Sequence, residues 1–459
     1  MGMEIDMKKI GSSRTEKESN IKLDIIALLD DIDNGKYSNI QINYYFNEKK
    51  YSYKEKMFIT NIINITLKNL IYIDYMLSKV TKNIHKRKIR HLLRISAAQL
   101  FFTEADAAGI LYEAGELSRK INSHQASFVN AVLHSLIKNK KYIEDGIPSD
   151  KKEGIIHSYP QWFVNKIKNE YPEDYLEIMK SYKNRSYISV RYDKEVLNKN
   201  KFNKILSDIN SEIIFSVDEV YYLSNGNILN TEEFKKGSIV IQDASSYLAV
   251  KNLNVKKGDK VLDACSAPGG KALAILQMSD PELLLATDIH EHKIGILENL
   301  RKKYNYDNFK VKLNDATEIE KLDMKFDRIL LDVPCSGLGV LRKKPEKIYS
   351  LSTVQIKELK KLQQKIFASA YNSLKDGGYI IYSTCTFTRN ENTNNVMTFL
   401  EKYNRLEMQE VEIPDNIHIE RDSYGGVYIT HKNKYLDGFY IAKFKKKNYR
   451  EDFPAWNSN

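Results

Sequence analysis

The sequence carries a thiol at the end of each of two short motifs, Asp-Val-Pro-Cys at 332–335 and Ser-Thr-Cys at 383–385. An apolar run precedes each motif, over residues 326–331 and 377–382. Short apolar runs flanked by Gly and Pro are typical of fully buried strands. The chain has only three cysteines, and the third, Cys265, also follows an apolar run. We therefore expect each thiol at the end of a buried strand, on the rim of a parallel sheet.

A turn rich in small residues begins at the third thiol. Small residues let the backbone approach a ligand closely, and the N-terminus of the helix predicted at 270–278 adds free N–H donors. The turn is neither the dinucleotide pattern G-x-G-x-x-G nor a P-loop. It predicts a ligand site at the switch point of the sheet without identifying the ligand. The turn consists of Cys265, Ser266, Ala267, Pro268, Gly269, Gly270 and Lys271.

Three aspartates narrow the choice of ligand. Asp288, Asp315 and Asp332 stand at the ends of successive predicted strands. An acid at the second strand end is placed to bind ribose hydroxyls, and one after the third could accept from an exocyclic amine. A single aspartate is usually a helix cap or part of a turn, but three in register favour a ligand. Together with the turn they predict an adenosine-type cofactor without a pyrophosphate.

Two thiols beside such a cofactor suit methylation at C5 of cytosine. That carbon is a poor nucleophile, but a thiolate that adds to C6 turns the ring into an enamine, which can attack a methyl sulfonium. Charge develops at N3, so an acid placed there lowers the barrier. Asp332 precedes Cys335 closely enough to act at N3 and the amino group. One thiol must attack and the other can serve in release, and the chemistry alone does not assign the two roles.

The elements around these residues predict a Rossmann-like domain. From residue 242 on, strands alternate with helices, which indicates a parallel sheet. A late pair of strands at 427–430 and 438–442 would finish it antiparallel. We expect strands at 260–264, 283–288, 309–314, 326–332 and 378–384, and helices at 270–278, 291–303 and 353–374.

The N-terminal part has a different pattern. After a polar stretch at 1–20 that we expect to be flexible, apolar residues recur at three- and four-residue spacing through 21–145, which predicts an all-helical bundle. Residues 150–240 mix helical and alternating patterns and predict a small α+β connecting domain. The catalytic domain is expected at 241–448, followed by a tail at 449–459. The chain is therefore multidomain.

The charge of the chain favours a nucleic-acid partner. The 459 residues carry a formal net charge of +11, which suits an anionic partner, with nucleic acid ahead of an acidic membrane surface. A basic cluster falls between predicted helices of the bundle, where it serves either as a solvated face or as a phosphate contact. The cluster comprises Lys79, Lys82, Lys86, Arg87, Lys88, Arg90 and Arg94.

The sequence also indicates the compartment. No stretch has the length and apolarity of a membrane span, and the N-terminus lacks the pattern of a signal peptide. An odd number of cysteines without CxxC spacing argues against a disulfide framework and against a structural metal. We expect a cytoplasmic protein.

Taken together, the motifs resemble a known family. Residues 332–339, residues 383–386 with the later pair Glu391 and Asn392, and the turn at 267–271 resemble the RNA cytosine-C5 methyltransferases, almost continuously over 242–445. The stretch from 89 through 133 resembles the helical fold of the antitermination factor NusB. Such a combination resembles the family members that act on 16S ribosomal RNA.

The resemblance implies a class I methyltransferase domain behind a NusB-like RNA-binding bundle. It implies that Cys385, in the Thr-Cys motif, is the nucleophile and that Cys335 acts in product release. It also implies S-adenosyl-L-methionine as methyl donor, with no metal, and 16S ribosomal RNA as partner. We expect no membrane association, and the sequence identifies no protein partner. The implied cofactor site consists of residues 265–271, Asp288, Asp315 and Asp332.

Two other functions stay open at this point. A methyltransferase for transfer RNA would share every catalytic residue and differ in the front domain. A non-catalytic RNA-binding factor could keep the methyltransferase domain as a scaffold, although the presence of Cys335, Cys385 and Asp332 argues against it. Methylation of an amino group is disfavoured because 332–335 is not the Asn/Asp-Pro-Pro-aromatic motif.

Overall fold

A computed structural model describes residues 21–82 and 84–449. The chain forms two compact units. The first contains residues up to 183 together with 343–350, and the second contains 184–342 and the residues from 351 on. The expected flexible stretch at 1–20 and residues 450–459 of the expected tail lie outside the described residues.

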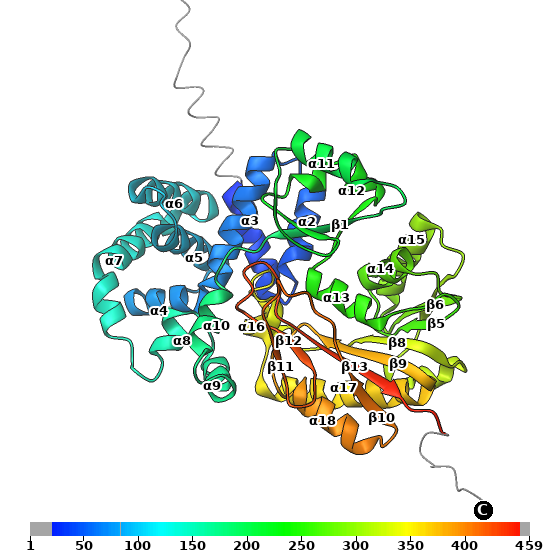
Figure 1. Ribbon diagram of the computed structural model, residues 1–459. Coiled ribbons are helices and arrows are strands. Elements are labelled where there is room, and N and C mark those ends of the chain that lie inside the picture. The colour runs from blue at the N-terminus through cyan, green and yellow to red at the C-terminus, as the bar shows by residue number, and fades with distance from the viewer. Residues whose placement is uncertain (1–20, 83, 450–459) are drawn as a thin grey trace, which may run out of the picture. The chain divides into compact units, whose positions relative to one another are not determined.

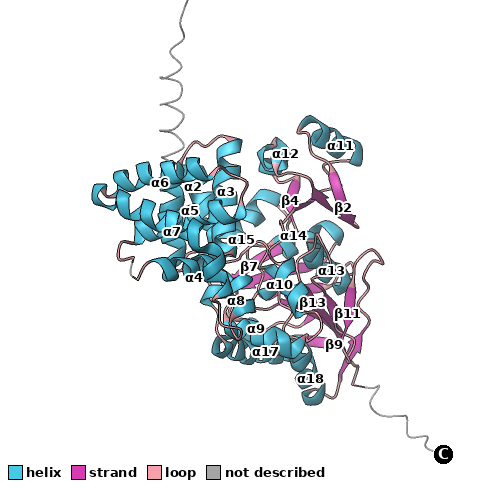
Figure 2. Ribbon diagram, turned by 90° about the vertical axis from the view of Figure 1, so that its left-hand side faces the viewer, coloured by secondary structure: helices cyan, strands magenta, loops and turns pink. Residues whose placement is uncertain are grey.

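The first unit is a helical bundle, and its described residues contain no strand (Figure 2). Apolar positions from successive helices, such as Ile63, Leu93 and Leu133, are fully buried in one core, so the predicted all-helical bundle is confirmed. Within the described residues no helix is long and apolar enough to cross a membrane. A helix at 21–33 is followed by α2 (Ser38–Glu48), α3 (Tyr53–Lys68), α4 (Leu70–Val80), α5 (Arg87–Phe102), α6 (Ala107–Ile121), α7 (Ala126–Asp145), α8 (Lys152–Ile156), α9 (Gln161–Glu170) and α10 (Tyr175–Ser181).

Two helix boundaries in the bundle differ from the periodicity of the sequence. Apolar residues recur continuously from Met57 to Ile71, but α3 ends at Lys68 and α4 begins at Leu70. Asn69 separates them, with a non-helical backbone and a side-chain amide that donates to the carbonyl of Ile65. The pattern continues across the break because both helices bury their apolar faces in the same core.

A segment from late in the chain belongs to this unit. Residues 343–350 include the short helix α16 (Lys347–Ser350). The Oε1 atom of Glu346 accepts from the backbone N–H of Ser38 at 3.1 Å and from its hydroxyl at 2.9 Å. The hydroxyl of Tyr349 donates to the carbonyl of Leu67. The expected catalytic domain at 241–448 is therefore interrupted at 343–350.

The second unit begins with a small antiparallel sheet in the order β2-β3-β1-β4. Two helices, α11 (Lys199–Asp208) and α12 (Glu232–Lys236), accompany it. Residues 150–183, which were expected to belong to this α+β segment, group with the helical unit instead, because they form α8 to α10 rather than strands. The strands are β1 (Ile188–Tyr192), β2 (Ile213–Val217), β3 (Val220–Leu223) and β4 (Ile239–Ile241).

A nine-stranded sheet forms the centre of the second unit (Figure 1). Its order is β11-β12-β13-β9-β8-β5-β6-β7, with β10 paired to β13. The strands from β9 to β7 run parallel, and the strands at the other end run antiparallel. The predicted Rossmann-like sheet and its late antiparallel pair are confirmed. The strands are β5 (Lys260–Asp263), β6 (Leu283–Asp288), β7 (Phe309–Leu313), β8 (Phe326–Asp332), β9 (Leu374–Thr384), β10 (Leu406–Gln409), β11 (Ile419–Arg421), β12 (Val427–Ile429) and β13 (Phe439–Lys446).

Helices cover both faces of this sheet, which is why its central strands contain uninterrupted apolar runs such as residues 329–331 of β8. On β8, Leu330 packs in a core with α13 (Ala244–Leu253), α14 (Gly270–Met278) and α15 (Glu291–Tyr304). The next residue, Leu331, packs in a second core with α17 (Thr353–Ser373) and α18 (Thr393–Lys402). The strand order reverses between β5 and β8, so the carboxyl ends of these two strands form the expected ligand-binding edge.

Candidate active site

The two thiol motifs end two neighbouring strands. Strands β8 and β9 pair in parallel, with Asp332 opposite Ser383. The loops that follow bring the Sγ atoms of Cys335 and Cys385 to 3.3 Å from each other. Both thiols are partly buried. The structure therefore brings together the two cysteines that the sequence placed on one rim.

A buried carboxylate connects the two thiol loops. Glu391 is fully buried, and its Oε1 accepts from the backbone N–H of Ser336 at 2.8 Å. Its Oε2 accepts from the hydroxyl of Ser336 at 2.6 Å and from that of Thr388 at 2.8 Å. The side chain of Gln363, on α17, donates to the same carboxylate at 3.1 Å. Since Ser336 follows Cys335 directly, these bonds fix the loop that carries this thiol.

A glycine makes close approach of the loops possible. The N–H of Gly339 donates to the carbonyl of Cys385 at 2.9 Å, and the Gly339 carbonyl accepts from Gly438 at 3.0 Å. A Cβ at Gly339 would lie 1.9 Å from the backbone oxygen of Gly438. Only glycine fits there, so the backbone itself sets the position of Cys385.

Asp332 is held on both of its oxygens. Its Oδ2 pairs with the Nζ of Lys271 at 2.6 Å, and its Oδ1 accepts from the hydroxyl of Ser383 at 3.1 Å. Burial alone would lower the pKa of Lys271, but the negative charge of Asp332 outweighs burial and raises that pKa. The pair thus consists of a lysine cation and a carboxylate anion, and it connects the glycine-rich turn to the end of β8.

The glycine-rich turn leaves acceptor groups unsatisfied. Asp263 ends β5, is fully buried, and has no hydrogen-bond partner for either carboxylate oxygen within the described residues. The buried hydroxyl of Ser266 lies near this carboxyl group and acts to lower its pKa, but the two make no hydrogen bond of ordinary geometry. Burial raises the pKa of Asp263 to about 7. Buried polar groups are nearly always satisfied, so the turn has the acceptors that a ligand with donors or positive charge would use.

Sequence reasoning missed Asp263, which was read as part of the apolar run 260–264. The rule that singled out Asp288 and Asp332, an acid at the carboxyl end of a parallel strand, would have found it. Gly269 closes the turn with φ 100°, and a Cβ on it would lie 2.5 Å from the side chain of Leu300. The turn therefore needs glycine for its conformation and for its packing.

The other two predicted aspartates lie along the same edge. Asp288, at the end of β6, is buried, accepts from the N–H of His290 at 3.1 Å and pairs with Lys293 at 3.3 Å. Asp315 follows β7 and accepts from the N–H and the hydroxyl of Thr317 at 2.8 and 2.9 Å. Both therefore also stabilise their own turns. Because the strand order is β8-β5-β6-β7, the four acids stand side by side on the sheet.

Cys265 differs from the other two thiols. It packs against the core between the sheet and α17, and burial raises the pKa of its thiol above the usual range. A thiol that remains protonated is a poor nucleophile. Cys265 therefore acts in packing rather than as a nucleophile.

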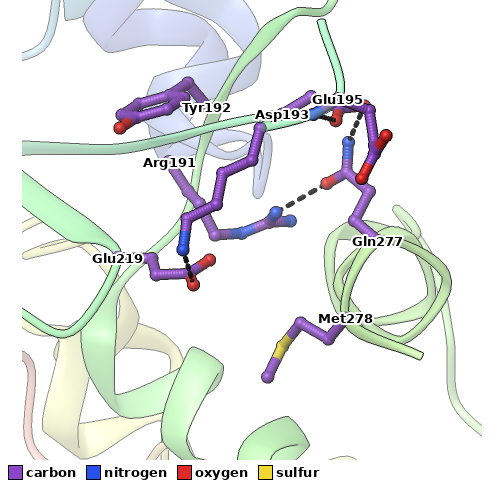
Figure 3. Close-up of a pocket in the computed structure, with 8 residues that line it drawn as sticks. Arg191, Tyr192, Asp193, Glu195, Glu219, Gln277 and Met278 are labelled. Carbon is purple, nitrogen blue, oxygen red and sulfur yellow. Dashed lines mark hydrogen bonds and ion pairs between the residues drawn. The ribbon is translucent and has the colours of Figure 1, made fainter. Parts of the chain in front are cut away.

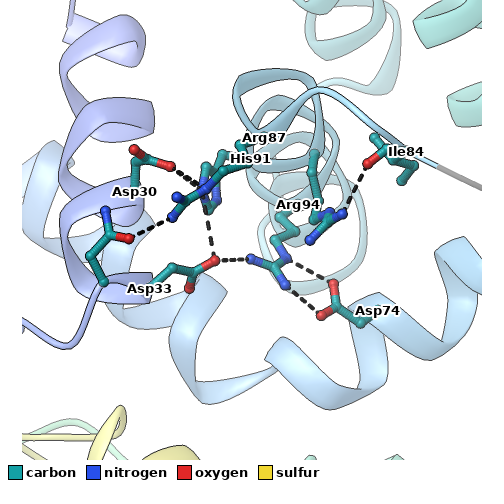
Figure 4. Close-up of polar contacts among 9 residues, drawn as sticks. Asp30, Asp33, Asp74, Ile84, Arg87, His91 and Arg94 are labelled. Atoms are coloured by element: carbon teal, nitrogen blue, oxygen red, sulfur yellow. Dashed lines mark hydrogen bonds and ion pairs between the residues drawn. The ribbon is translucent and has the colours of Figure 1, made fainter.

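Arginines of the basic cluster make polar contacts within the helical unit (Figure 4). Arg94 is buried and pairs with Asp33 at 2.9 Å and Asp74 at 2.7 Å. Arg87 pairs with Asp30 at 2.9 Å, and Arg90 donates to the carbonyl of Ile84. These arginines hold the bundle together. The exposed lysines of the cluster are Lys79, Lys82, Lys86 and Lys88.

The mixed sheet with a ligand edge at its switch point has a Rossmann-like architecture that suits a methyltransferase. The family model described as 16S rRNA methyltransferase RsmB/F matches residues 250–445, and that of the NusB family matches 21–138. The curated protein named probable ribosomal RNA small subunit methyltransferase B, from Bacillus subtilis (strain 168), is 30% identical over 470 residues, covering 96% of this chain and 100% of the relative. The chain belongs to the RsmB/F family of ribosomal RNA methyltransferases.

Other comparisons agree. Ribosomal RNA small subunit methyltransferase B of Yersinia enterocolitica is 26% identical, covering 87% of this chain and 92% of the relative. The crystal structure of PH0851 has the same fold, with a TM-score of 0.77 at 21% identity over 93% of this chain and 98% of that one. The structure of NSun6 from Pyrococcus horikoshii with SFG reaches a TM-score of 0.57 at 20% identity, covering 64% of this chain and all of that one. The resemblance inferred from the motifs is confirmed, and membership implies S-adenosylmethionine as methyl donor.

Proposed function

We propose that this protein methylates C5 of a cytosine in 16S ribosomal RNA through a transient bond between a cysteine and C6. The observation that carries the proposal is the 3.3 Å separation of the Cys335 and Cys385 sulfurs next to Asp332, which is bonded to the Thr-Cys motif through Ser383. Two thiols and a carboxylate at one edge are the groups that this chemistry requires. The names of the curated relatives support ribosomal RNA of the small subunit as the substrate.

Cys385 is the proposed nucleophile. Its thiolate forms a bond to C6, and the displaced electron pair moves through the ring to N3, which leaves C5 able to attack. Asp332 is proposed to share a proton with N3 and to accept from the 4-amino group, so it stabilises the charge where it develops. The ion pair with Lys271 and the bond from Ser383 hold this carboxylate in place.

Cys335 is proposed to complete the reaction. After C5 is methylated, the Cys335 thiolate takes the proton from C5, the C5–C6 double bond forms again, and the Cys385 sulfur leaves with the electrons of the S–C6 bond. The 3.3 Å separation does not distinguish the two sulfurs. The division of roles therefore follows the resemblance, in which the cysteine of the Thr-Cys motif is the nucleophile. The hydrogen bonds that Ser336 donates to Glu391 hold the loop of Cys335 beside Cys385.

The carboxyl edge of the sheet fits S-adenosylmethionine, which supplies a methyl carbon on a positively charged sulfur. The unsatisfied carboxylate of Asp263 and hydroxyl of Ser266 offer acceptors, and the backbone of 265–271 lies close to them. Asp288 is proposed to bind the ribose hydroxyls and Asp315 the adenine amine. Each carboxylate would accept through lone pairs that the hydrogen bonds within its own turn do not use. Lys271 acts through Asp332, to which it is bonded.

The test of the chemistry is a pair of variants. Cys385→Ala is expected to transfer no methyl group and to form no adduct, whereas Cys335→Ala is expected to accumulate a protein–RNA adduct that survives denaturing electrophoresis and appears only with S-adenosylmethionine. Cys265→Ala serves as the control and is expected to methylate the RNA without accumulating an adduct. Full methylation by Cys385→Ala would show that the nucleophile is assigned wrongly.

The test of the substrate is a map of 5-methylcytosine in total RNA from cells with and without the gene, made by bisulfite sequencing. Loss of one site in 16S ribosomal RNA is the expected result. Loss of a site in transfer RNA instead would overturn the ribosomal assignment and leave the proposed chemistry intact.

A further inference from the structure

A pocket lies in the second unit, between the small sheet and α14 (Figure 3). It has a volume of about 250 Å³. Arg191 from β1 lies at its inner wall, and Glu219, from the turn between β2 and β3, lies on one side. Gln277 and Met278, the last two residues of α14, lie on the other side. None of these residues takes part in the site described above.

Arg191 is a buried cation that lacks an acidic partner. Its side chain is 1% exposed. Its Nε donates to the side-chain oxygen of Gln242 at 2.9 Å and its Nη1 to that of Gln277 at 2.6 Å, both neutral amides. Its Nη2 is buried and has no hydrogen-bond partner among residues 21–82 and 84–449. Arginine is rarely buried unless it is paired, and a buried donor is rarely left unsatisfied. The structure therefore lacks one acceptor at this point.

The guanidinium group points toward Gln277 and toward the space above Met278 (Figure 3). Met278 is 37% exposed and offers an apolar thioether at the mouth of the pocket. Thioethers make favourable contacts with aromatic rings. The pocket thus combines one unsatisfied donor at its inner wall with one exposed apolar surface.

The charges of the lining argue against a phosphate. Three carboxylates, from Asp193, Glu195 and Glu219, face two cations, Arg191 and Lys194. In addition, the pocket lies at the C-terminal end of α14, where the helix dipole is negative. An anion would be repelled by both. A neutral ligand that accepts from Arg191 and donates to a carboxylate avoids this repulsion.

We infer that this pocket binds an unstacked guanine or cytosine base of the RNA substrate, an inference that rests on the proposed function. Guanine presents its O6 carbonyl beside N1–H and the 2-amino group, and cytosine presents its O2 carbonyl and its 4-amino group on the same edge. The carbonyl accepts from Nη2 of Arg191, and an amino group donates to the oxygen of Glu219 that is not paired with Lys194. The ring packs on Met278. Single-stranded RNA is recognised in this manner, by hydrogen bonds to base edges combined with packing on the ring faces.

The test compares three variants of the full-length chain with the wild type in equilibrium binding to a 16S ribosomal RNA fragment. Arg191→Lys removes the fork of donors, Glu219→Gln removes the acceptor, and Met278→Glu removes the apolar surface. Gln242 is left unchanged because it also donates to the carbonyl of Gly270 in the glycine-rich turn at 3.1 Å. Ile296→Glu, at an exposed apolar position on α15, is the matched control.

Each of the three variants is expected to weaken RNA binding by about tenfold, the usual worth of a base contact. The dependence of affinity on salt should stay the same, because a base contact releases no counterion. For Glu219→Gln and Met278→Glu, the affinity for S-adenosylmethionine and the thermal midpoint should match those of the wild type. These two variants test the pocket even if Arg191→Lys folds poorly. Free guanosine or cytidine is expected to compete with the RNA, and adenosine is not.

Three results would overturn the inference. Unchanged RNA affinity in Glu219→Gln and Met278→Glu would show that the pocket holds no part of the RNA. A salt dependence reduced by one phosphate contact, or competition by inorganic phosphate equal to that of the nucleosides, would identify an anion site. A wild-type protein that binds the RNA and methylates another atom would contradict the proposed function and leave the base pocket standing, whereas one that binds no RNA would contradict both.

Discussion

Glu391 accepts hydrogen bonds from both the backbone N–H and the hydroxyl of Ser336, at 2.8 and 2.6 Å. Glu391 follows the Ser-Thr-Cys motif at 383–385, and Ser336 follows the Asp-Val-Pro-Cys motif at 332–335. A single carboxylate therefore joins the two thiol loops. Replacement of a carboxylate by an amide keeps the size but exchanges one acceptor for a donor. Both oxygens of Glu391 already accept, Oε1 from the backbone N–H of Ser336 and the amide of Gln363, and Oε2 from two hydroxyls. An amide nitrogen in either place would therefore face donors instead of acceptors.

We therefore expect Glu391→Gln to reduce the rate of methyl transfer by tenfold or more, since small misplacements of reacting groups have effects of about that size. Affinity for S-adenosylmethionine should stay unchanged. Single-turnover kinetics separate the two quantities, and Glu358→Gln on the exposed side of α17 is the control. If S-adenosylmethionine binding fell together with the rate, Glu391 would support the whole fold rather than position the thiol loop.

The proximity of the thiols has a redox consequence. With the two Sγ atoms 3.3 Å apart, mild oxidation by diamide should join Cys335 to Cys385 and stop methylation, and dithiothreitol should restore it. Peptide mass spectrometry should find this disulfide, while Cys265 stays reduced because burial raises the pKa of its thiol and disfavours the reactive thiolate. Inactivation through a disulfide that includes Cys265 would contradict this picture.

Asp263 should make binding of S-adenosylmethionine depend on pH. Burial raises the pKa of Asp263 to about 7, so the carboxyl is mostly neutral at pH 6 and mostly charged at pH 8. A positively charged sulfonium favours the charged form. Affinity measured by calorimetry should therefore rise between pH 6 and pH 8, and the rise should be absent in Asp263→Asn. Equal pH profiles for the two proteins would remove Asp263 from the cofactor site.

Lys183 should make the stability of the helical unit depend on pH in the alkaline range. Burial lowers the pKa of Lys183 from 10.5 to about 7, and the nearby charge of Lys68 acts in the same direction. Between pH 7 and pH 10.5 the unfolded chain therefore binds more protons at this site than the folded one, so the free energy of unfolding should increase as the pH rises.

One such group contributes at most about 1.4 kcal/mol per pH unit. In Lys183→Met the increase should be smaller, and the variant should be at least as stable as the wild type at pH 7. Lys180→Met, at an exposed position nearby, is the control. Denaturant titrations at pH 7, 8 and 9 provide the measurement, and parallel curves for wild type and Lys183→Met would refute the expectation.

The division of the basic cluster predicts two different phenotypes. Neutralising the exposed Lys86 and Lys88 should lower RNA affinity without loss of stability, and should reduce the slope of log affinity against log salt by about 0.7–0.9 per lost phosphate contact. Arg94→Met should instead destabilise the protein by about 1.5–3 kcal/mol, because it removes the charge-assisted hydrogen bonds of a buried arginine to the partly exposed carboxylates of Asp33 and Asp74. Salt titrations of RNA binding and thermal denaturation distinguish the two. An unchanged salt slope would show that this face is merely solvated.

Local patterns were enough to predict the sheet. Strands β5, β6 and β8 contain short apolar runs and end in Asp, and such patterns are set by residues adjacent in sequence. The cysteine pair followed from the same rule, because the carboxyl ends of parallel strands share an edge. Asp263 escaped attention because an acid at the end of an apolar run looks like part of the strand, and only its burial reveals an unsatisfied charge.

Features that depend on distant parts of the chain could not be predicted. The hydrogen bonds that Ser336 donates to Glu391 join residues far apart in sequence. Nothing in the sequence around one residue indicates that it contacts the other. Arg94 and Lys86 look alike in a basic cluster, although one is an internal ion-pair partner and the other is exposed. The membership of 343–350 in the helical unit likewise depends on contacts with Ser38 and Leu67, which no local pattern indicates.

That last segment limits how the gene can be divided. Because 343–350 completes the helical unit from within the catalytic sequence, the chain passes from one unit to the other three times, after residues 183, 342 and 350. No single cut yields two self-sufficient pieces: a fragment that ends at 183 lacks the helix α16 and the anchor of Ser38, and the remainder carries that segment without its partner. An exchange of the helical unit would have to replace both of its parts together, the residues up to 183 and residues 343–350.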